Sequence, residues 1–213
     1  MRNDKGEGVV FYNYFSGRDV FALSEEEVEL IKDAYKFFVK NDVEEALSVY
    51  AVTILKRYVE AAGLPKEREA AYTASIYLAS RHPFSFPNHV SKGEFAERFR
   101  LKASSLEWYA ETISERLGFI KIYDYNRFPY YIDPESVIGT VLCSVVKSTV
   151  EEIGVRTMLG IEVMNEDEVV EGLVERLVDR LKIVPPIFRR EMHRVIRELM
   201  YREIEKLRER RSV

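Results

Sequence analysis

The sequence predicts an all-α protein that carries one short β-hairpin. From Ser24 to Arg211, most apolar residues recur every three or four positions, which is the spacing of helices with one buried face. Between Phe119 and Ile132, aromatic and β-branched residues instead flank a polar turn, which is the pattern of a hairpin. The 213 residues are enough for one large domain or two small ones.

The composition is that of a folded, soluble protein, because 46% of the residues are hydrophobic and 32% are charged. No apolar run approaches the roughly 20 residues that a membrane-spanning helix needs. Cys143 is the only cysteine, so no intrachain disulfide can form. The first residues lack the apolar core of a signal peptide, and we therefore expect a cytoplasmic protein.

The charged residues indicate the kind of organism from which the protein comes and restrict how it could bind nucleic acid. The sequence contains no glutamine and is rich in Glu, Lys and Arg, a bias that is typical of thermophiles. The formal net charge of −4 argues against a protein that holds nucleic acid by bulk electrostatic attraction. Binding of nucleic acid would instead require a local basic patch.

The first half of the chain is predicted to contain an N-terminal arm, residues 1–23, followed by helices. Ser24 and Glu27 form the pattern of a capping box at the start of the first helix. Asp42 is expected to cap a second helix, which ends at Gly63 and the proline that follows.

The third predicted helix, residues 66–81, has almost no polar face. Alanine and other small residues lie nearly all round it, so we expect other helices to surround it closely. A rigid loop that contains Pro83 and Pro87 then separates this helix from the next pair.

The next stretch is predicted to form a helix, a tight turn and a second helix, followed by the hairpin. Ser91 and Glu94 give the first helix a capping box. The turn comprises residues 100–102, and Ser104 or Ser105 is expected to cap the second helix. The positions expected to face inward are all apolar or aromatic: Phe95, Ala96, Phe99, Leu101, Leu106, Tyr109, Ile113 and Leu117.

The second half, residues 133–213, is predicted to be a helical region that ends in an antiparallel pair of helices. Asp133 is expected to cap its first helix, and Asn165 the first member of the final pair. The prolines at 185–186 separate that helix from the last one. The apolar stripes of the pair exceed what one neighbour needs, so we expect them to pack on the first half or to self-associate.

The helix pair with the tight turn resembles the helix-turn-helix family. Ala96 stands where the family has a small residue at the crossing of its helices, and Phe99 and Leu101 flank the turn as apolar residues do there. Arg100 departs from the pattern, because the family usually has glycine in the turn. With the hairpin that follows, the stretch resembles a winged helix whose wing tip is Arg127.

A second resemblance covers residues 24–118, whose succession of helices is similar to the cyclin-box repeat of archaeal transcription factor B. The Ala-rich central helix has the texture of that family in Ala70, Ala71, Ser75, Tyr77, Ala79 and Arg81. The resemblances imply a cyclin-box-like or winged-helix domain over residues 24–132. A full transcription factor B is not expected, because no clustered Cys and His residues are present for its zinc ribbon.

No group of residues predicts catalysis or the binding of a metal or cofactor. His82, His89 and His193 have neither cysteines nor paired carboxylates at ligand spacing. Cys143 lies in an apolar helix, where an inert buried thiol is expected. The chain also lacks a glycine-rich loop that could cradle phosphate. We therefore expect a protein that is not an enzyme and that needs no cofactor.

The predicted binding surface lies around the turn and the hairpin tip, where cations can meet phosphate and the second helix can approach base edges. The predicted DNA-binding residues are Lys92, Arg100, Lys102, Ser104, Ser105, Trp108 and Arg127. Glu107 and Glu111 share the outward face of the second helix and would repel phosphate, so a solvated acidic face is the alternative. The last helix, residues 187–211, carries nine basic and five acidic residues and is either a self-neutralised surface or a nucleic-acid patch.

These features together predict a non-enzymatic, DNA-associated transcription protein that uses a helix-turn-helix on duplex DNA. The alternative is a helical protein-protein interaction module, either a cyclin-like adaptor or a self-associating scaffold, that does not bind DNA directly. The expected partners are duplex DNA or a protein of the transcription machinery. A homo-oligomer formed through the C-terminal helices is also expected. Binding to a membrane is not expected.

Overall fold

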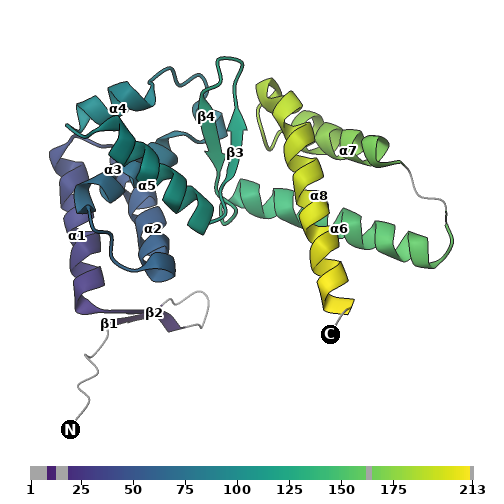
Figure 1. Ribbon diagram of the computed structural model, residues 1–213, viewed down its shortest axis with the longest axis horizontal. Coiled ribbons are helices and arrows are strands. Elements are labelled where there is room, and N and C mark those ends of the chain that lie inside the picture. Colours follow the sequence, from purple (N-terminus) through teal and green to yellow (C-terminus); the bar gives the residue numbers. More distant parts are fainter. Residues whose placement is uncertain (1–8, 13–18, 162–164, 212–213) are drawn as a thin grey trace, which may run out of the picture. The chain divides into compact units, whose positions relative to one another are not determined.

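The computed structural model describes residues 9–12, 19–161 and 165–211, and within them the chain is mostly helical (Figure 1). The α-helices in these ranges are α1 (Glu25–Lys40), α2 (Glu45–Ala62), α3 (Arg68–Ser80), α4 (Lys92–Arg98), α5 (Ala103–Arg116), α6 (Val137–Met158), α7 (Glu166–Val174) and α8 (Arg189–Arg211). A π-helical segment, Glu175–Arg180, follows α7 directly.

Two antiparallel strand pairs accompany the helices. β3 (Ile120–Tyr123) pairs with β4 (Pro129–Ile132), which confirms the predicted hairpin. β1 (Val9–Tyr12) pairs with β2 (Asp19–Leu23), a pair that the sequence analysis did not predict. The rest of the predicted N-terminal arm, residues 1–8 and 13–18, lies outside the described residues.

The chain divides into two compact units. Unit 1 comprises Met1–Ser80 and Val90–Leu117, and unit 2 comprises Arg81–His89 and Gly118–Val213. The chain therefore passes between the units three times. This division groups the β3–β4 hairpin with the C-terminal helices, whereas the predicted domain of residues 24–132 groups it with the helix pair. The predicted domain boundaries stay a prediction.

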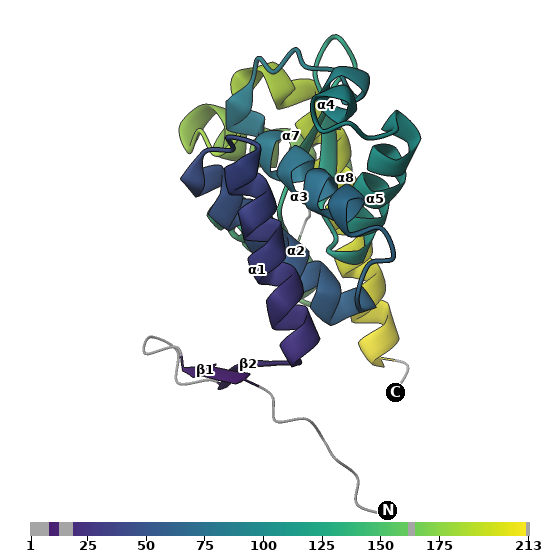
Figure 2. The ribbon, with the colours of Figure 1, turned by 90° about the vertical axis from the view of Figure 1, so that its left-hand side faces the viewer.

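Unit 1 is built around α3, which packs against α1, α2 and α5. Every residue from Ala70 to Ala79 is buried, as expected for a helix that other helices surround. Figure 2 shows α1 running alongside α2 in this unit. The ring of Phe37 on α1 lies 5.7 Å from that of Tyr72 on α3 and 6.0 Å from that of Phe99 after α4. These aromatic contacts join α1 to α3 and to the turn that follows α4.

The predicted capping box at the start of α1 is confirmed. Ser24 N donates to Glu27 Oε2 at 2.8 Å, and Glu27 N donates to Ser24 Oγ at 3.3 Å. The prediction for α2 is wrong, because its N-cap is Glu44, whose side chain makes no capping bond. Asp42 instead adopts a left-handed conformation, with φ +53°, in the turn between α1 and α2.

The predicted cap of α6 is also wrong. The N-cap is Ser136, whose Oγ accepts from Gly139 N at 3.1 Å. Asp133 acts one turn earlier, where its Oδ1 accepts from Glu135 N at 3.0 Å. The backbone of this turn approaches α6 closely, since a Cβ at Gly139 would lie 2.0 Å from Asp133 O. Only glycine fits at that position without a shift of the backbone.

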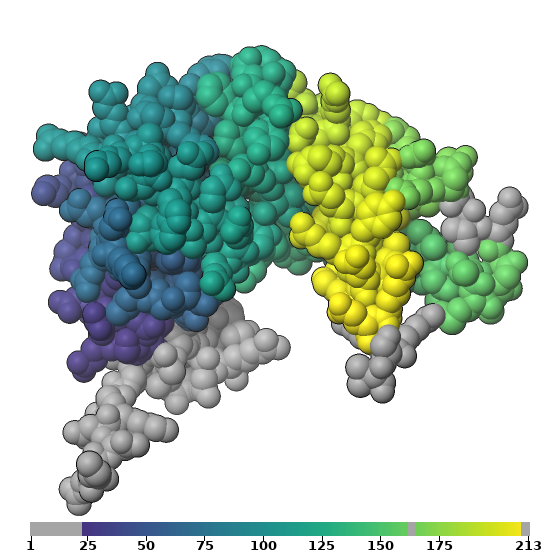
Figure 3. Space-filling model, viewed as in Figure 1, coloured from purple at the N-terminus to yellow at the C-terminus, as the bar shows by residue number. Residues whose placement is uncertain are grey.

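The core of unit 2 lies between the hairpin and the three C-terminal helices. Ile120 pairs with Ile132 and Ile122 pairs with Tyr130, and all four side chains are buried in this core. The ring of Phe188, before α8, meets that of Tyr130 at 5.1 Å. α8 packs against both α6 and α7, and Figure 3 shows it (yellow) as a continuous ridge beside their green surface.

Ion pairs join α7 to α8 in antiparallel order. Arg197 lies 2.8 Å from Glu166 and 2.5 Å from Asp167. Arg189, eight residues earlier, pairs with Glu171, which lies later on α7. Within α8, Arg194 and Lys206 pair with glutamates three or four residues away. These contacts favour a self-neutralised surface over a nucleic-acid patch on the last helix.

We expect Leu177→Asp to destabilise unit 2 by about 3 kcal/mol or more, because it places an unpaired carboxylate in an apolar core. Leu177 is completely buried in the core of this unit. Urea unfolding followed by circular dichroism measures the effect. Leu181→Asp is the matched control, because Leu181 is 51% exposed and should tolerate the same change. Equal unfolding curves for the two variants would contradict the assigned core.

Candidate nucleic-acid interface

The predicted helix, tight turn and helix are present in unit 1 as α4, residues 99–102 and α5. Leu101 N donates to Ala96 O at 2.9 Å, and Arg100 N donates to Glu97 O at 2.9 Å, so the backbone closes tightly after α4. Arg100 has φ +56°, in the left-handed region that glycine enters most easily. The arginine therefore adopts a conformation for which glycine is the better suited residue.

The capping box of α4 is confirmed. Ser91 N donates to Glu94 Oε2 at 2.7 Å, and Glu94 N donates to Ser91 Oγ at 3.2 Å. The bonds from Ser91 lower the pKa of the Glu94 carboxyl group. Among the predicted inward residues, those that are buried are Phe95, Ala96, Phe99, Leu106, Tyr109 and Ile113. The other two, Leu101 and Leu117, are half-buried.

The predicted cap of α5 is wrong. Its N-cap is Lys102, which has the extended backbone of a cap but makes no capping bond through its side chain. Ser104 and Ser105 lie inside the first helical turn, where the backbone is already helical. No acidic residue occupies this turn, so the positive end of the helix dipole is not opposed locally.

The predicted DNA-binding residues fall into both units. Arg100, Lys102 and Ser104 are exposed, Ser105 is half-buried, and Trp108 is 59% exposed. No ion pair within the described ranges engages Arg100 or Lys102. The side chains around the start of α5 thus include two available cations, two hydroxyl groups and an exposed indole ring.

Arg127 belongs to unit 2, at the tip of the β3–β4 hairpin. Its φ is +65°, and its guanidinium carbon lies 5.5 Å from the centre of the Tyr123 ring. Asp124 shapes this tip, because its Oδ1 accepts from Asn126 N at 2.8 Å and from Phe128 N at 2.9 Å. The hairpin therefore presents Arg127 in a tightly bonded turn, as predicted for its tip.

Lys92 is placed differently from the expectation for a phosphate-binding residue. Its Nζ lies 2.6 Å from Glu107 Oε1 and 3.9 Å from Glu111 Oε1. The two carboxylates on the outward face of α5 are therefore partly neutralised by a cation from α4. This arrangement reduces their repulsion of an anion and also reduces what Lys92 offers to one.

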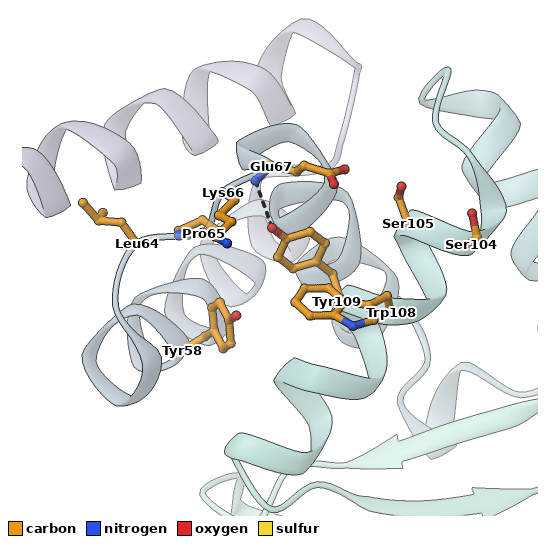
Figure 4. Close-up of a pocket in the computed structure, with 9 residues that line it drawn as sticks. All are labelled: Tyr58, Leu64, Pro65, Lys66, Glu67, Ser104, Ser105, Trp108 and Tyr109. Atoms are coloured by element: carbon orange, nitrogen blue, oxygen red, sulfur yellow. Dashed lines mark hydrogen bonds between the residues drawn. The ribbon is translucent and has the colours of Figure 1, made fainter.

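A hollow that the sequence analysis missed lies beside the start of α5 (Figure 4). The loop between α2 and α3 forms its opposite wall, and Tyr109 holds this loop by accepting a hydrogen bond from Glu67 N at 2.9 Å. The hollow has a volume of about 480 Å³. Its lining residues are Tyr58, Leu64, Pro65, Lys66, Glu67, Ser104, Ser105, Trp108 and Tyr109. The one signal for it in the sequence is Trp108, a large aromatic residue at an outward position of its helix.

Burial raises the pKa of the Tyr58 phenol inside this hollow, and the neighbouring Tyr109 raises it further, while Arg116 opposes both effects. The phenol therefore stays protonated at neutral pH and can donate a hydrogen bond.

Other features offer little for chemistry. No cluster of His, Cys, Asp or Glu within the described ranges could hold a metal ion. Burial raises the pKa of the half-buried Cys143 thiol, which keeps the group protonated. In the same ranges, no helix is both long and apolar enough to cross a membrane.

Comparisons with known proteins assign this chain to no family. No model of a protein family matches the sequence, and no curated protein shows significant similarity to it.

We expect Arg100→Gly to stabilise unit 1 by about 0.5–1 kcal/mol, because it relieves the left-handed strain in the turn. Thermal melting should show an increase of a few degrees. Lys182→Gly is the matched control, since Lys182 is also an exposed basic residue with positive φ, +51°, but lies in unit 2. A loss of stability in Arg100→Gly would show that the arginine side chain contributes more to the fold than the strain removes.

Proposed function

We propose that this chain is a non-enzymatic, DNA-associated transcription protein of archaeal type that contacts duplex DNA through α5. The observation that carries the proposal is the combination of a strained arginine in the turn with an exposed helix start. Arg100 and Lys102 directly precede the first turn of α5, and no acidic residue lies in that turn. The resemblance to helix-turn-helix proteins and to the cyclin-box repeat of transcription factor B supports the same class.

In the proposed complex, phosphate groups meet Arg100, Lys102 and the first backbone N–H groups of α5. Ser104 and Ser105, on the first turn, approach the edges of the bases, and Trp108 follows one turn later. The helix enters the major groove by its N-terminal end, as recognition helices of this class do.

The glutamates of α5 are compatible with this end-on approach. Glu107 and Glu111 lie four and eight residues beyond Ala103, which is about 6 and 12 Å along the helix axis. Glu107 directly precedes Trp108, so the approach depends on Lys92, which lies against both carboxylates and offsets part of their charge. Their charge limits how much of α5 can follow the groove.

We expect Lys102→Ala to weaken binding to every duplex sequence and to lower the salt slope of the affinity by about one unit, because one phosphate contact is lost. Fluorescence anisotropy with a labelled duplex at several salt concentrations measures both. Arg100→Gly should have the same effect although it stabilises the fold. Lys182→Ala is the control and should bind as the parent protein does. Absence of duplex binding by the parent protein at low salt would refute the proposal.

The double variant Glu107→Gln and Glu111→Gln should tighten non-specific binding, because it removes repulsion and releases Lys92 for phosphate contact. The same anisotropy measurement detects the change. Glu115→Gln, on the same helix but one turn further from its start, should have a smaller effect. A double variant that binds no more tightly than the Glu115 control would contradict the proposed approach of the helix.

A second candidate is a protein-interaction module that self-associates through the C-terminal helices. The end of α6 and the residues after it expose a run of apolar side chains, Val155, Met158, Leu159 and Ile161. A hollow of about 400 Å³ between α6 and α8 lies beside them, lined in part by Met158 and Leu207. Size-exclusion light scattering tests this candidate. A mass above that of one chain, together with no duplex binding, would favour it over the first proposal.

A further inference from the structure

Trp108 is exposed, and its indole ring contacts the aromatic side chain that follows it in the sequence. The indole ring makes an edge contact with the ring of Tyr109, with 4.7 Å between centroids and 88° between planes. Tyr109 is itself buried, and its hydroxyl group is bonded to Glu67 N across the hollow. The indole therefore gives the hollow an exposed aromatic wall beside a tyrosine that is fixed by its own hydrogen bond.

The hollow combines three kinds of group. Trp108, Tyr58 and Leu64 provide flat or apolar surface. Hydrogen-bonding groups come from the serines at the start of α5 and from the Glu67 carboxylate, which Figure 4 shows pointing toward Ser105 from the opposite wall. Lys66 provides a cation, and no ion pair within the described part of the chain engages it. The volume, about 480 Å³, falls within the roughly 300–1,000 Å³ of ligand sites.

These groups restrict the chemistry of the ligand. A flat ring is required to use Trp108, and donors on that ring are required to use the Glu67 carboxylate. A negative charge beside the ring would use Lys66, whereas a small anion alone would be repelled by Glu67. A nucleotide whose base carries an amino group meets all three requirements.

From this geometry we infer that the hollow binds a nucleotide, with its base stacked on Trp108 and its phosphate near Lys66. The nucleotide is either free or part of an unpaired strand. Base edges are read by the Glu67 carboxylate and by the hydroxyl groups of Ser105 and Tyr58. A duplex keeps its bases stacked and does not fill the hollow, so the two contacts differ in ligand and in their cations, Lys66 here and Arg100 and Lys102 there, although both use Ser105 and Trp108 of α5.

Trp108 is the only tryptophan of the chain, so intrinsic fluorescence reports directly on the hollow. The full chain is titrated with deoxycytidine monophosphate and with a single-stranded oligodeoxycytidylate of about ten nucleotides. We expect saturable quenching by the single strand. Equal quenching by the mononucleotide, at equal concentration of bases, assigns the site to free nucleotides. Quenching by the strand alone assigns it to unpaired nucleic acid, and both results support the inference.

Variants then test the two walls of the hollow by anisotropy of a labelled single strand. Trp108→Ala should weaken binding about 10-fold or more, because one stacked base is lost, whereas Trp108→Phe should retain most of the affinity. Lys66→Glu should weaken binding as well, and Lys182→Glu should not. All of these positions are exposed, and circular dichroism checks that each variant is folded.

The outcome is distinguishable from that of the duplex proposal. Arg100→Gly should weaken duplex binding while leaving single-strand binding near that of the parent protein, and Lys66→Glu should do the reverse. No saturable quenching by the strand or the mononucleotide would overturn the inference. Equal single-strand affinity of Trp108→Ala and the parent protein would overturn it too, whatever the duplex measurements show.

Discussion

Burial of the Arg81 guanidinium group is the constraint on which unit 2 depends. The residue is completely buried, and its Nη1 donates to Asn88 O at 2.8 Å. Its guanidinium carbon lies 5.5 Å from the ring centre of Phe128 and 5.8 Å from that of Tyr130. Its own backbone oxygen accepts from Tyr131 N at 2.8 Å. Because a buried charge costs several kcal/mol unless such partners surround it, the loop and the hairpin must close together.

That closure also builds the aromatic part of the core. Asn88 N donates to the Tyr130 hydroxyl group at 2.9 Å, and Tyr131 N donates to Arg81 O, so strand β4 and the loop are bonded in both directions. Phe86 then contacts the rings of Tyr130 and Phe188, at 6.0 and 5.8 Å. The hairpin is thereby held against the start of α8, and its tip carries Arg127 at a fixed place in the unit. A loop that the sequence presents only as rigid is thus an integral part of the core.

Features formed within a few residues could be predicted from the sequence. The capping boxes at Ser24 and Ser91 were correct because both partners lie three residues apart and use only local backbone groups. The hairpin was correct because its alternating residues and turn are contiguous. The predicted cap of α5 was wrong for a related reason. The helix starts after Lys102 without any side-chain acceptor, so the nearby hydroxyl groups of Ser104 and Ser105 were mistaken for the cap. A buried arginine was not expected, because this residue type is almost always exposed.

The candidate site was only partly accessible to the same reasoning. The turn and the outward position of Trp108 follow from helical spacing, and both were expected. The contact of Lys92 with Glu107 joins residues 15 positions apart, and the bond from Glu67 N to Tyr109 joins residues 42 positions apart. Such contacts depend on how helices pack, which periodicity does not specify. The hollow was missed because its second wall comes from the distant loop between α2 and α3.

The threefold passage of the chain between units has a consequence for its synthesis on the ribosome. Leu117, the last residue of unit 1, is made before any part of the hairpin. Arg81 precedes Phe128 by 128 − 81 = 47 residues, an interval of roughly 2–10 s at about 5–20 residues per second. During that time its guanidinium group keeps its water, since the rings that will cover it have not yet been made. All of unit 1 is therefore synthesised before β4, and unit 2 is completed only when α8 leaves the ribosome.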